Sequence, residues 1–327
     1  MTISKASVSD FALKNATYLI FAVILLYFGL QAPHFLSVES LGNIVKQGSF
    51  IGIAAIGMTF VLLIAGIDLS VGAVIYLAPL VSGLVMQQFG IPPVLGLFVA
   101  LAMGLLLGSI NAFLIVKLQI VPFIVTLATL FFFRGFGVWL TDSVPFDFEQ
   151  SFLTFGATSI IGIPLPIWAL AVVAALGHFV LAYTGFGRQV YAVGNNPEVA
   201  RKAGLNVDWV QARCYIICSG CAAIAGYIWI AQIGRLDAGF GEGKEFDVIA
   251  AAVLGGVSLF GGAGSAIGAV VGAVLIQTVT AGLSFTGVNL YAQPIVQGII
   301  IFFAVFIDGI RGKRVAALLK RTIRPVN

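Results

Sequence analysis

Residues 92–116 read PPVLGLFVALAMGLLLGSINAFLIV, a stretch of 25 residues without a charged side chain. About 20 mostly apolar residues are enough for a helix to cross the hydrocarbon core of a bilayer, so this stretch predicts a transmembrane helix. The whole chain shares this character, because 60% of its 327 residues are hydrophobic and 9% are charged, whereas a soluble domain carries roughly 25% charge. The composition argues against a soluble enzyme, a disordered regulator and a nucleic-acid binder. It predicts an all-α, polytopic membrane helix bundle.

Further apolar stretches predict about ten membrane spans within a single transmembrane domain, residues 1–327. Two junctions between spans are unusually tight, at 66–70 and at the glycine-rich 261–264. Each fits either a hairpin of two full spans or a re-entrant, broken segment, and both alternatives return the chain to the same side. The predicted spans are 16–33, 48–66, 71–89, 92–116, 120–140, 160–182, 212–233, 248–262, 264–283 and 294–307.

The basic residues are distributed unevenly over this topology. With ten crossings and the N-terminus inside, the 17 Lys and Arg residues fall in inside segments except for Lys46, Arg134, Arg235 and Lys244. Inside loops of membrane proteins are enriched in Lys and Arg. Both termini are therefore predicted to be cytoplasmic.

The longest inside loop, residues 184–212, contains the signals of a complete short helix that ends at Gly204. Asn196 is suited to cap the first free amides, and Pro197 suits the first helical position, which needs no amide hydrogen. Charged side chains stand at the helix ends whose dipole favours them: Glu198, Arg201 and Lys202. A helix of about two turns is marginal in water. It needs a surface, which is either the membrane interface or a partner protein.

Polar side chains inside apolar stretches are candidates for a transport path. An acid at membrane depth usually marks function, but Asp68 or Ser70 can instead cap the next span, and we favour that structural role. Arg134 is expected to snorkel near an outer helix end or to pair with Asp68. Three glutamines lie within or beside late spans: Gln277, Gln293 and Gln297. Their amides can line a path for a polyhydroxy solute or bond to neighbouring helices.

Small residues predict close helix packing. Glycine recurs every four residues at Gly264, Gly268 and Gly272, a spacing that forms a flat helix face. Three cysteines share one helix face: Cys214, Cys218 and Cys221. One helix cannot surround a tetrahedral ion, and free Cys packs as a small hydrophobe. We therefore expect packing at these positions and no metal site.

Four blocks of sequence resemble the permeases of ribose-type ABC sugar importers, the carbohydrate uptake transporter-2 family. The blocks are GMTFVLL (57–63) with GIDLSVG (66–72), PFIVTL (122–127) with RG (134–135), the loop 194–204, and EFDVIAA (245–251) with GGVSLFGG (255–262). They follow the family's order across about residues 50 to 265. The departures from the family pattern are Ala112 after Asn111, Ala128, Lys244 and Phe246. These bear on substrate or outer-loop contacts.

The resemblance implies a function and partners. The chain would be the permease subunit of an ATP-driven importer in the bacterial inner membrane, moving a monosaccharide or related polyol inward by alternating access and catalysing no reaction itself. Its partners would be a cytoplasmic ABC ATPase subunit that holds ATP and Mg, a periplasmic sugar-binding protein, a second permease copy or related permease, and membrane lipid. No cofactor is expected on this chain. The alternative is an ion-coupled secondary transporter, whose broken helices the two tight junctions would match.

The resemblance also implies roles for individual residues. The loop helix would dock on the ATPase subunit through Asn196, Pro197, Glu198, Ala200, Arg201, Lys202 and Gly204. The candidates for the translocation path or its gate are Asp68, Ser70, Asn111, Arg134, Gln277, Gln293 and Gln297.

Overall fold

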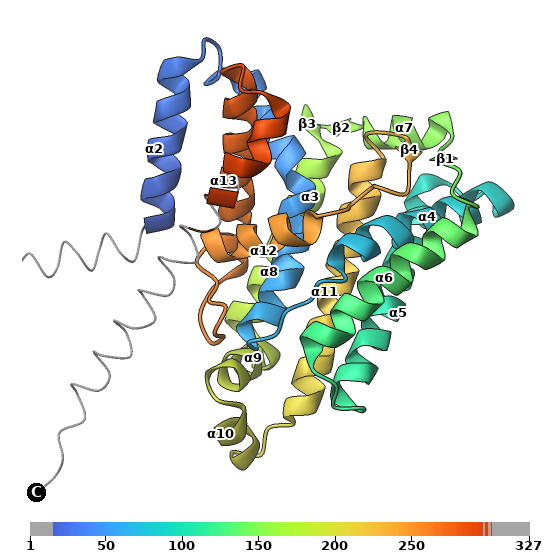
Figure 1. Cartoon of the computed structure of the whole chain (residues 1–327), viewed down its shortest axis with the longest axis vertical. Coiled ribbons are helices and arrows are strands. Elements are labelled where there is room, and N and C mark those ends of the chain that lie inside the picture. The colour runs from blue at the N-terminus through green and yellow to red at the C-terminus, as the bar shows by residue number, and fades with distance from the viewer. Residues whose placement is uncertain (1–15, 297, 300–301, 303–327) are drawn as a thin grey trace, which may run out of the picture.

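The computed structural model describes residues 16–296, 298, 299 and 302, which are built mainly of helices (Figure 1). Among them, seven helices are long and apolar enough to cross a membrane: α3 (Val38–Leu63), α4 (Val71–Phe89), α5 (Pro93–Val116), α6 (Pro122–Leu140), α8 (Leu165–Tyr183), α11 (Val207–Ile230) and α13 (Ala266–Phe285). A shorter apolar helix, α2 (Ala16–Gln31), packs against α13. The prediction of a polytopic membrane helix bundle is confirmed.

One predicted span differs from the structure, and another is largely untested. Residues 248–262 do not form one span, because α12 (Lys244–Leu254) has only 11 residues. At 1.5 Å per residue it is about 16 Å long, roughly half of the hydrocarbon core. The chain then turns at glycines with positive φ, a conformation that ends helices: Gly256, Gly261, Gly262 and Gly264. The span predicted at 294–307 lies largely outside the described residues, so the total of about ten spans stays a prediction.

The first turns of α3 were missed by the hydropathy pattern. This helix begins at Val38, whereas the sequence predicted a span from residue 48. Ser37 caps it, since its hydroxyl accepts a hydrogen bond from the Ser40 amide at 3.2 Å. The added turns carry Glu39 and Lys46, which lower the apolar signal although the backbone remains helical.

α3 and α11 form the centre of the bundle. In their most apolar stretches 83% and 72% of residues are buried, compared with 28% in both α6 and α8. α3 packs against α11, α13 and α8, while α11 also packs against α5 and α4. α5 approaches α11 closely at Gly104, where an added Cβ would lie 2.4 Å from the Ala223 Cβ. The outer helices expose apolar side chains such as Phe113, Phe132 and Phe179, as expected where a bilayer surrounds the protein.

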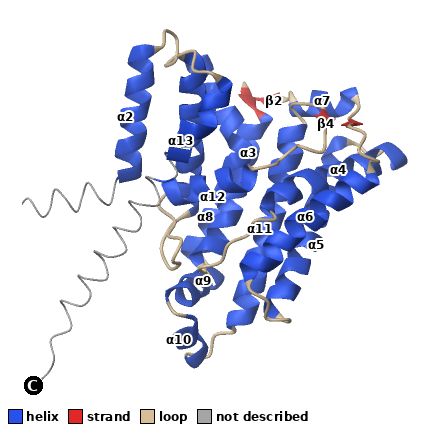
Figure 2. Cartoon of the chain, viewed as in Figure 1, coloured by secondary structure: helices blue, strands red, loops and turns tan. Residues whose placement is uncertain are grey.

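The two ends of the bundle carry different elements (Figures 1 and 2). One end, called the α10 end here, carries α9 (Gly185–Asn195) and α10 (Pro197–Lys202). The opposite end, called the strand end, carries α7 (Gln150–Gly156) and four short strands. β1 (Phe146–Asp147) pairs antiparallel with β4 (Arg235–Leu236), and β2 (Ser159–Ile160) pairs with β3 (Ile163–Pro164). A short 3-10 helix, η1 (Leu290–Ala292), follows α13.

Candidate functional site

The helix predicted within the loop 184–212 is present as α10. The Asn196 side-chain oxygen accepts hydrogen bonds from the amides of Glu198 and Val199, both at 3.0 Å. These bonds satisfy two of the free donors at the helix start. Gly204 follows with φ of +84°, a conformation suited to glycine. The capping pattern read from the sequence is thus confirmed for this helix.

α10 projects from the end of the bundle with most of its side chains exposed (Figure 1). Val199 is 61% exposed, so α10 presents an apolar side chain that nothing in the described chain covers. Arg201 pairs with Asp208 at 2.9 Å, but this exposed ion pair adds little to stability. Ala200 is only 4% exposed. Its side chain therefore packs α10 against the rest of the chain.

The end of α9 lies between the two tight junctions that the sequence identified. The Gly262 amide donates a hydrogen bond to the Leu63 carbonyl at 2.9 Å, which joins one junction to the end of α3. Gly194 packs on this bond, because an added Cβ would lie 1.7 Å from the Leu63 oxygen and 2.7 Å from the Gly262 nitrogen. The Tyr191 hydroxyl donates to the Gly264 carbonyl at 2.8 Å. We use the name α9 joint for five residues: Leu63, Tyr191, Gly194, Gly262 and Gly264.

The α9 joint connects the exposed helix to the interior of the bundle. α9 passes into α10 through the single residue Asn196, so a force on α10 reaches α9 directly. Burial raises the pKa of Tyr191 above its ordinary value, which keeps its hydroxyl protonated as a donor. The sequence indicated both junctions and the helix but not their contact. The only local hint was a glycine, Gly194, directly before the two asparagines.

Asp68, Ser70 and Asn111 form a buried hydrogen-bonded chain at the start of α4. Asp68 Oδ1 accepts hydrogen bonds from the Ser70 amide at 2.9 Å and from the Ser70 hydroxyl at 2.6 Å. Asn111 Nδ2, on α5, donates to Ser70 Oγ at 2.8 Å. All three side chains are fully buried. Ser70 is the N-cap residue of α4 without a capping side-chain bond; its own amide is instead bound by Asp68.

Arg134 does not pair with Asp68. Its Nη1 donates to the carbonyls of Ala238 at 2.7 Å and Phe240 at 3.2 Å, and its Nη2 donates to the Gly72 carbonyl at 3.5 Å. None of the ion pairs between described residues includes Arg134 or Asp68. The pairing alternative is therefore wrong for this structure. Arg134 instead ties the loop before α12 to the first turn of α4.

A buried acid, Glu245, lies beside Arg134. The sequence indicated it only as part of the block EFDVIAA (245–251). Glu245 is 7% exposed, and its Oε2 is so close to Gly72 that an added Cβ there would lie 2.2 Å away. This carboxylate stands at the first turn of α4, where the positive end of the helix dipole favours negative charge. α12 thus places a buried carboxylate against the start of α4.

The late glutamines make contacts within the described chain. Gln277 Nε2 on α13 donates to Gln47 Oε1 on α3 at 3.0 Å, and Gln293 Nε2 donates to Ser284 Oγ at 3.1 Å. These bonds agree with the alternative in which the amides bond to neighbouring segments. Gln297 lies outside the described residues.

Of the three glycines predicted to form one packing face, two lie on α13 and one precedes it. Gly268 and Gly272 lie on α13 against α12, where an added Cβ would be 2.2 Å from the Gly255 oxygen and 1.9 Å from the Ala251 oxygen. Gly264 precedes α13 with φ of +142°, so it is not part of that helix face.

Three free thiols lie on α11: Cys214, Cys218 and Cys221. The described residues contain no group of three or more His, Cys, Asp or Glu side chains that could hold a metal ion.

Comparison with known proteins gives consistent matches over most of the chain. A family model described as "Branched-chain amino acid transport system / permease component" matches residues 40–305. The ribose import permease protein RbsC of Haemophilus influenzae is 33% identical over 316 residues, covering 95% of this chain and 98% of that protein. RbsC of Bacillus subtilis is 36% identical over 299 residues, covering 90% and 92%. The D-allose transport system permease protein AlsC of Escherichia coli is 35% identical over 303 residues, covering 92% and 93%. No solved structure matches the chain.

Proposed function

The chain belongs to the ribose-type ABC sugar permeases, and on this basis we propose that it is the membrane-spanning subunit of an importer for a monosaccharide or related polyol. As a permease it is a transport component rather than an enzyme. Relatives named for ribose, D-allose and galactose are similar to it to nearly the same degree, between 33% and 36% identity. That spread of named sugars supports the monosaccharide class as the substrate.

The proposed orientation has both termini and the α10 end in the cytoplasm of a bacterium, with the chain in the inner membrane. The α10 end carries Arg188, Arg201, Lys202 and Arg213, and an excess of basic residues favours the inside. The strand end carries Asp142, Asp147 and Glu149 and faces the periplasm in this arrangement. A periplasmic sugar-binding protein would deliver the sugar there, to a pair of permease subunits.

The observation that carries the proposal is a capped, exposed helix that continues from α9, whose end packs on Leu63, before one tight junction, and on Gly262, in the other. α10 docks on a cytoplasmic ATPase subunit through Val199 and the charged side chains around it. ATP and Mg are held by that subunit, and its closure pulls on α10. The α9 joint passes the displacement to Leu63 and Gly262, and therefore to α3, α4 and the segment before α13. The ATPase thus binds one conformation of the permease better than the other, which is what alternating access requires.

The test is a mild-detergent purification of the tagged chain from its native membranes, with mass spectrometry of the proteins that co-purify. We expect an ABC ATPase with the wild-type chain and its loss with Arg201→Glu. Asp208→Asn removes the ion pair but keeps the cation, so it should retain the ATPase, and Arg201→Lys should retain it as well. Folded wild-type protein without an ATPase would contradict the proposal.

A second measurement distinguishes an ATP-driven importer from the alternative, an ion-coupled secondary transporter. Membrane vesicles supplied with ATP should accumulate the sugar in the presence of ionophores that collapse ion gradients. Uptake that stops with the ionophore while ATP is still present would favour the secondary transporter.

A further inference from the structure

Trp229, one residue before the end of α11, lies against two phenyl rings. Phe50 on α3 stacks on it with ring centroids 4.1 Å apart and planes 4° apart, and the Phe240 ring lies at 4.2 Å and 33°. Phe50 and Phe240 are buried, whereas Trp229 stays partly exposed. Its indole N–H donates no hydrogen bond to a described residue. A tryptophan in a protein interior usually finds a partner for this group, so the indole keeps an unused donor.

Phe240 reaches Trp229 because the loop 237–243 enters the bundle from the strand end (Figure 1). Phe50 stands 12 residues after Val38, the first residue of α3, which is about 18 Å along the helix axis at 1.5 Å per residue. Irregular backbone at such a depth is tolerated only where protein or a water-filled cavity surrounds it. Arg134 satisfies two carbonyls of this loop. The aromatic contact therefore lies inside the bundle, on a loop that comes from its surface.

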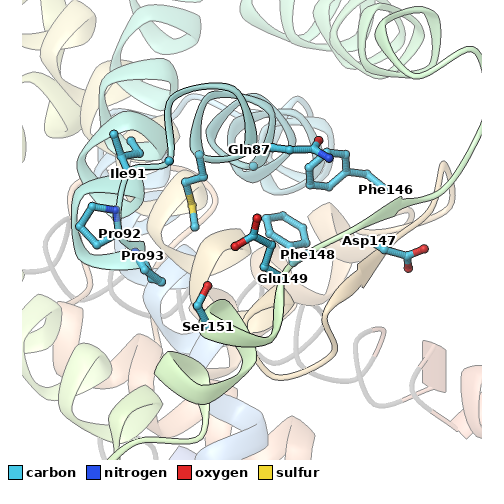
Figure 3. A pocket seen from close by; sticks show the side chains of 12 residues that line it. Gln87, Ile91, Pro92, Pro93, Phe146, Asp147, Phe148, Glu149 and Ser151 are labelled. Carbon is cyan, nitrogen blue, oxygen red and sulfur yellow. The ribbon is translucent and has the colours of Figure 1, made fainter.

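The loop 237–243 has fixed ends and a glycine-rich middle. Before it, β4 pairs with β1. Phe146 and Phe148, both seen in Figure 3, pack on α4, since an added Cβ on Gly83 would lie 2.6 and 2.7 Å from their rings. After it, the chain enters α12. Between these ends every second residue is a glycine, which gives the backbone around Phe240 wide conformational freedom: Gly239, Gly241 and Gly243.

A sugar ring matches the surface that Phe240 covers. The face of an aromatic ring carries negative charge, and the C–H groups on one face of a sugar ring carry partial positive charge, so the two rings stack. Ligand sites combine such surfaces with a few polar groups that fix the orientation. Gln47 lies one turn before Phe50 on the same face of α3. Its oxygen accepts from Gln277, while its own amide N–H groups have no partner among the described residues. Together with the indole N–H they are donors for sugar hydroxyls.

We propose that Trp229 is a stacking platform for the sugar in the translocation path, and that Phe240 covers this platform until the sugar replaces it. The inference rests on the proposed function, which makes a sugar the cargo and the strand end its side of entry. The arriving sugar stacks on the indole, and the loop 237–243 moves aside with Phe240. When the sugar moves on, Phe240 returns. Because ring and sugar compete for one surface, removing the Phe240 ring strengthens sugar binding.

The experiment uses the full-length chain with its ATPase subunit in proteoliposomes. Trp229 is made the single tryptophan by replacing the other three with Phe: Trp139, Trp168 and Trp209. The probes are ribose, D-allose and galactose, and the readout is the fluorescence of Trp229. We expect a saturable change with the sugar that the wild-type chain imports, and no change with trimethylamine N-oxide, which has no hydroxyl groups. Phe240→Ala should lower the sugar concentration that gives the half-maximal change by about 2- to 12-fold, as expected for the loss of one competing aromatic pair.

Phe246→Ala is the matched control, because Phe246 is an aromatic residue just after the loop and is 60% exposed. It should leave the half-maximal concentration unchanged. Uptake of the labelled sugar gives a second readout that does not depend on fluorescence. Trp229→Leu should lower uptake, whereas Trp229→Tyr, which keeps an aromatic face, should retain most of it. Trp139→Leu, at a tryptophan that is 70% exposed, should have no effect.

Two results would overturn the inference and leave the proposed function standing. One is Trp229 fluorescence that does not respond to a sugar imported by the wild-type chain. The other is an unchanged or higher half-maximal concentration with Phe240→Ala, which would show that Phe240 packs on Trp229 without competing with the sugar. If the wild-type complex imports no sugar when ATP and a solute-binding protein are present, the proposed function fails, and this inference fails with it.

Discussion

Replacing Gly194 by alanine should uncouple ATP hydrolysis from transport. The added Cβ would lie 1.7 Å from the Leu63 oxygen, and real Cβ atoms essentially never come closer than 3.0 Å. The backbones of α9 and α3 must therefore separate by at least about 1.3 Å, the difference between these two distances. Overpacking of this kind costs about 1–3 kcal/mol, and the hydrogen bond from Gly262 to Leu63 contributes about 0.5–1.5 kcal/mol that would also be at risk.

The free energy that couples two sites in a protein is typically about 1–3 kcal/mol, which corresponds to about 5- to 150-fold. We expect Gly194→Ala to reduce uptake per ATP hydrolysed by at least about fivefold, while α10 keeps its cap and the ATPase still co-purifies. Uptake of labelled sugar and release of phosphate are measured in the same proteoliposomes. Gly185→Ala is the control on the same helix, because the nearest atom to its added Cβ is a side-chain nitrogen of Arg188 at 3.8 Å. Equal transport ratios for the two variants would refute the role of the α9 joint.

Two further predictions concern the interior of the bundle. Ser70→Ala leaves the Asn111 amide without its buried acceptor, which costs about 1–3 kcal/mol. The midpoint temperature of thermal unfolding in detergent should therefore fall. The control is Ser109→Ala, at an exposed serine bonded within its own helix, which should leave this temperature nearly unchanged. An equal midpoint for the two variants would contradict the buried chain. Arg134→Lys replaces a planar fork by a single point charge, which cannot reach both the loop before α12 and the start of α4. Limited proteolysis should therefore cut the loop 237–243 faster. Unchanged cleavage there would show that this loop is held by other contacts.

The α9 joint also connects the two tight junctions to each other. An interrupted backbone at membrane depth is tolerated only where protein or a water-filled cavity surrounds it. Here the Gly262 amide of one junction bonds to the carbonyl that ends α3, directly before the other junction. This one bond satisfies both the Gly262 amide and the Leu63 carbonyl. A displacement of one cannot leave the other in place without breaking that bond.

The lengths of α12 and its neighbours resolve one question that the sequence left open. At 261–264 the preceding helix is too short to cross a bilayer core, so this junction is a broken segment. At 66–70 both flanking helices, α3 and α4, are of spanning length, and the connection is a hairpin. Topological parity could not distinguish these alternatives, because both return the chain to the same side.

Local features were predictable from the sequence alone. The length of an apolar run determines whether a segment can cross the bilayer, and the pair Asn196 and Pro197 determines where α10 begins, because the cap acts within three residues. The tertiary structure decided which distant segments meet. Arg134 binds carbonyls of the loop before α12 instead of Asp68, Asn111 reaches Ser70, and Gly194 packs on Leu63. These contacts depend on how helices are arranged in space, and hydropathy and capping patterns contain no information on that arrangement.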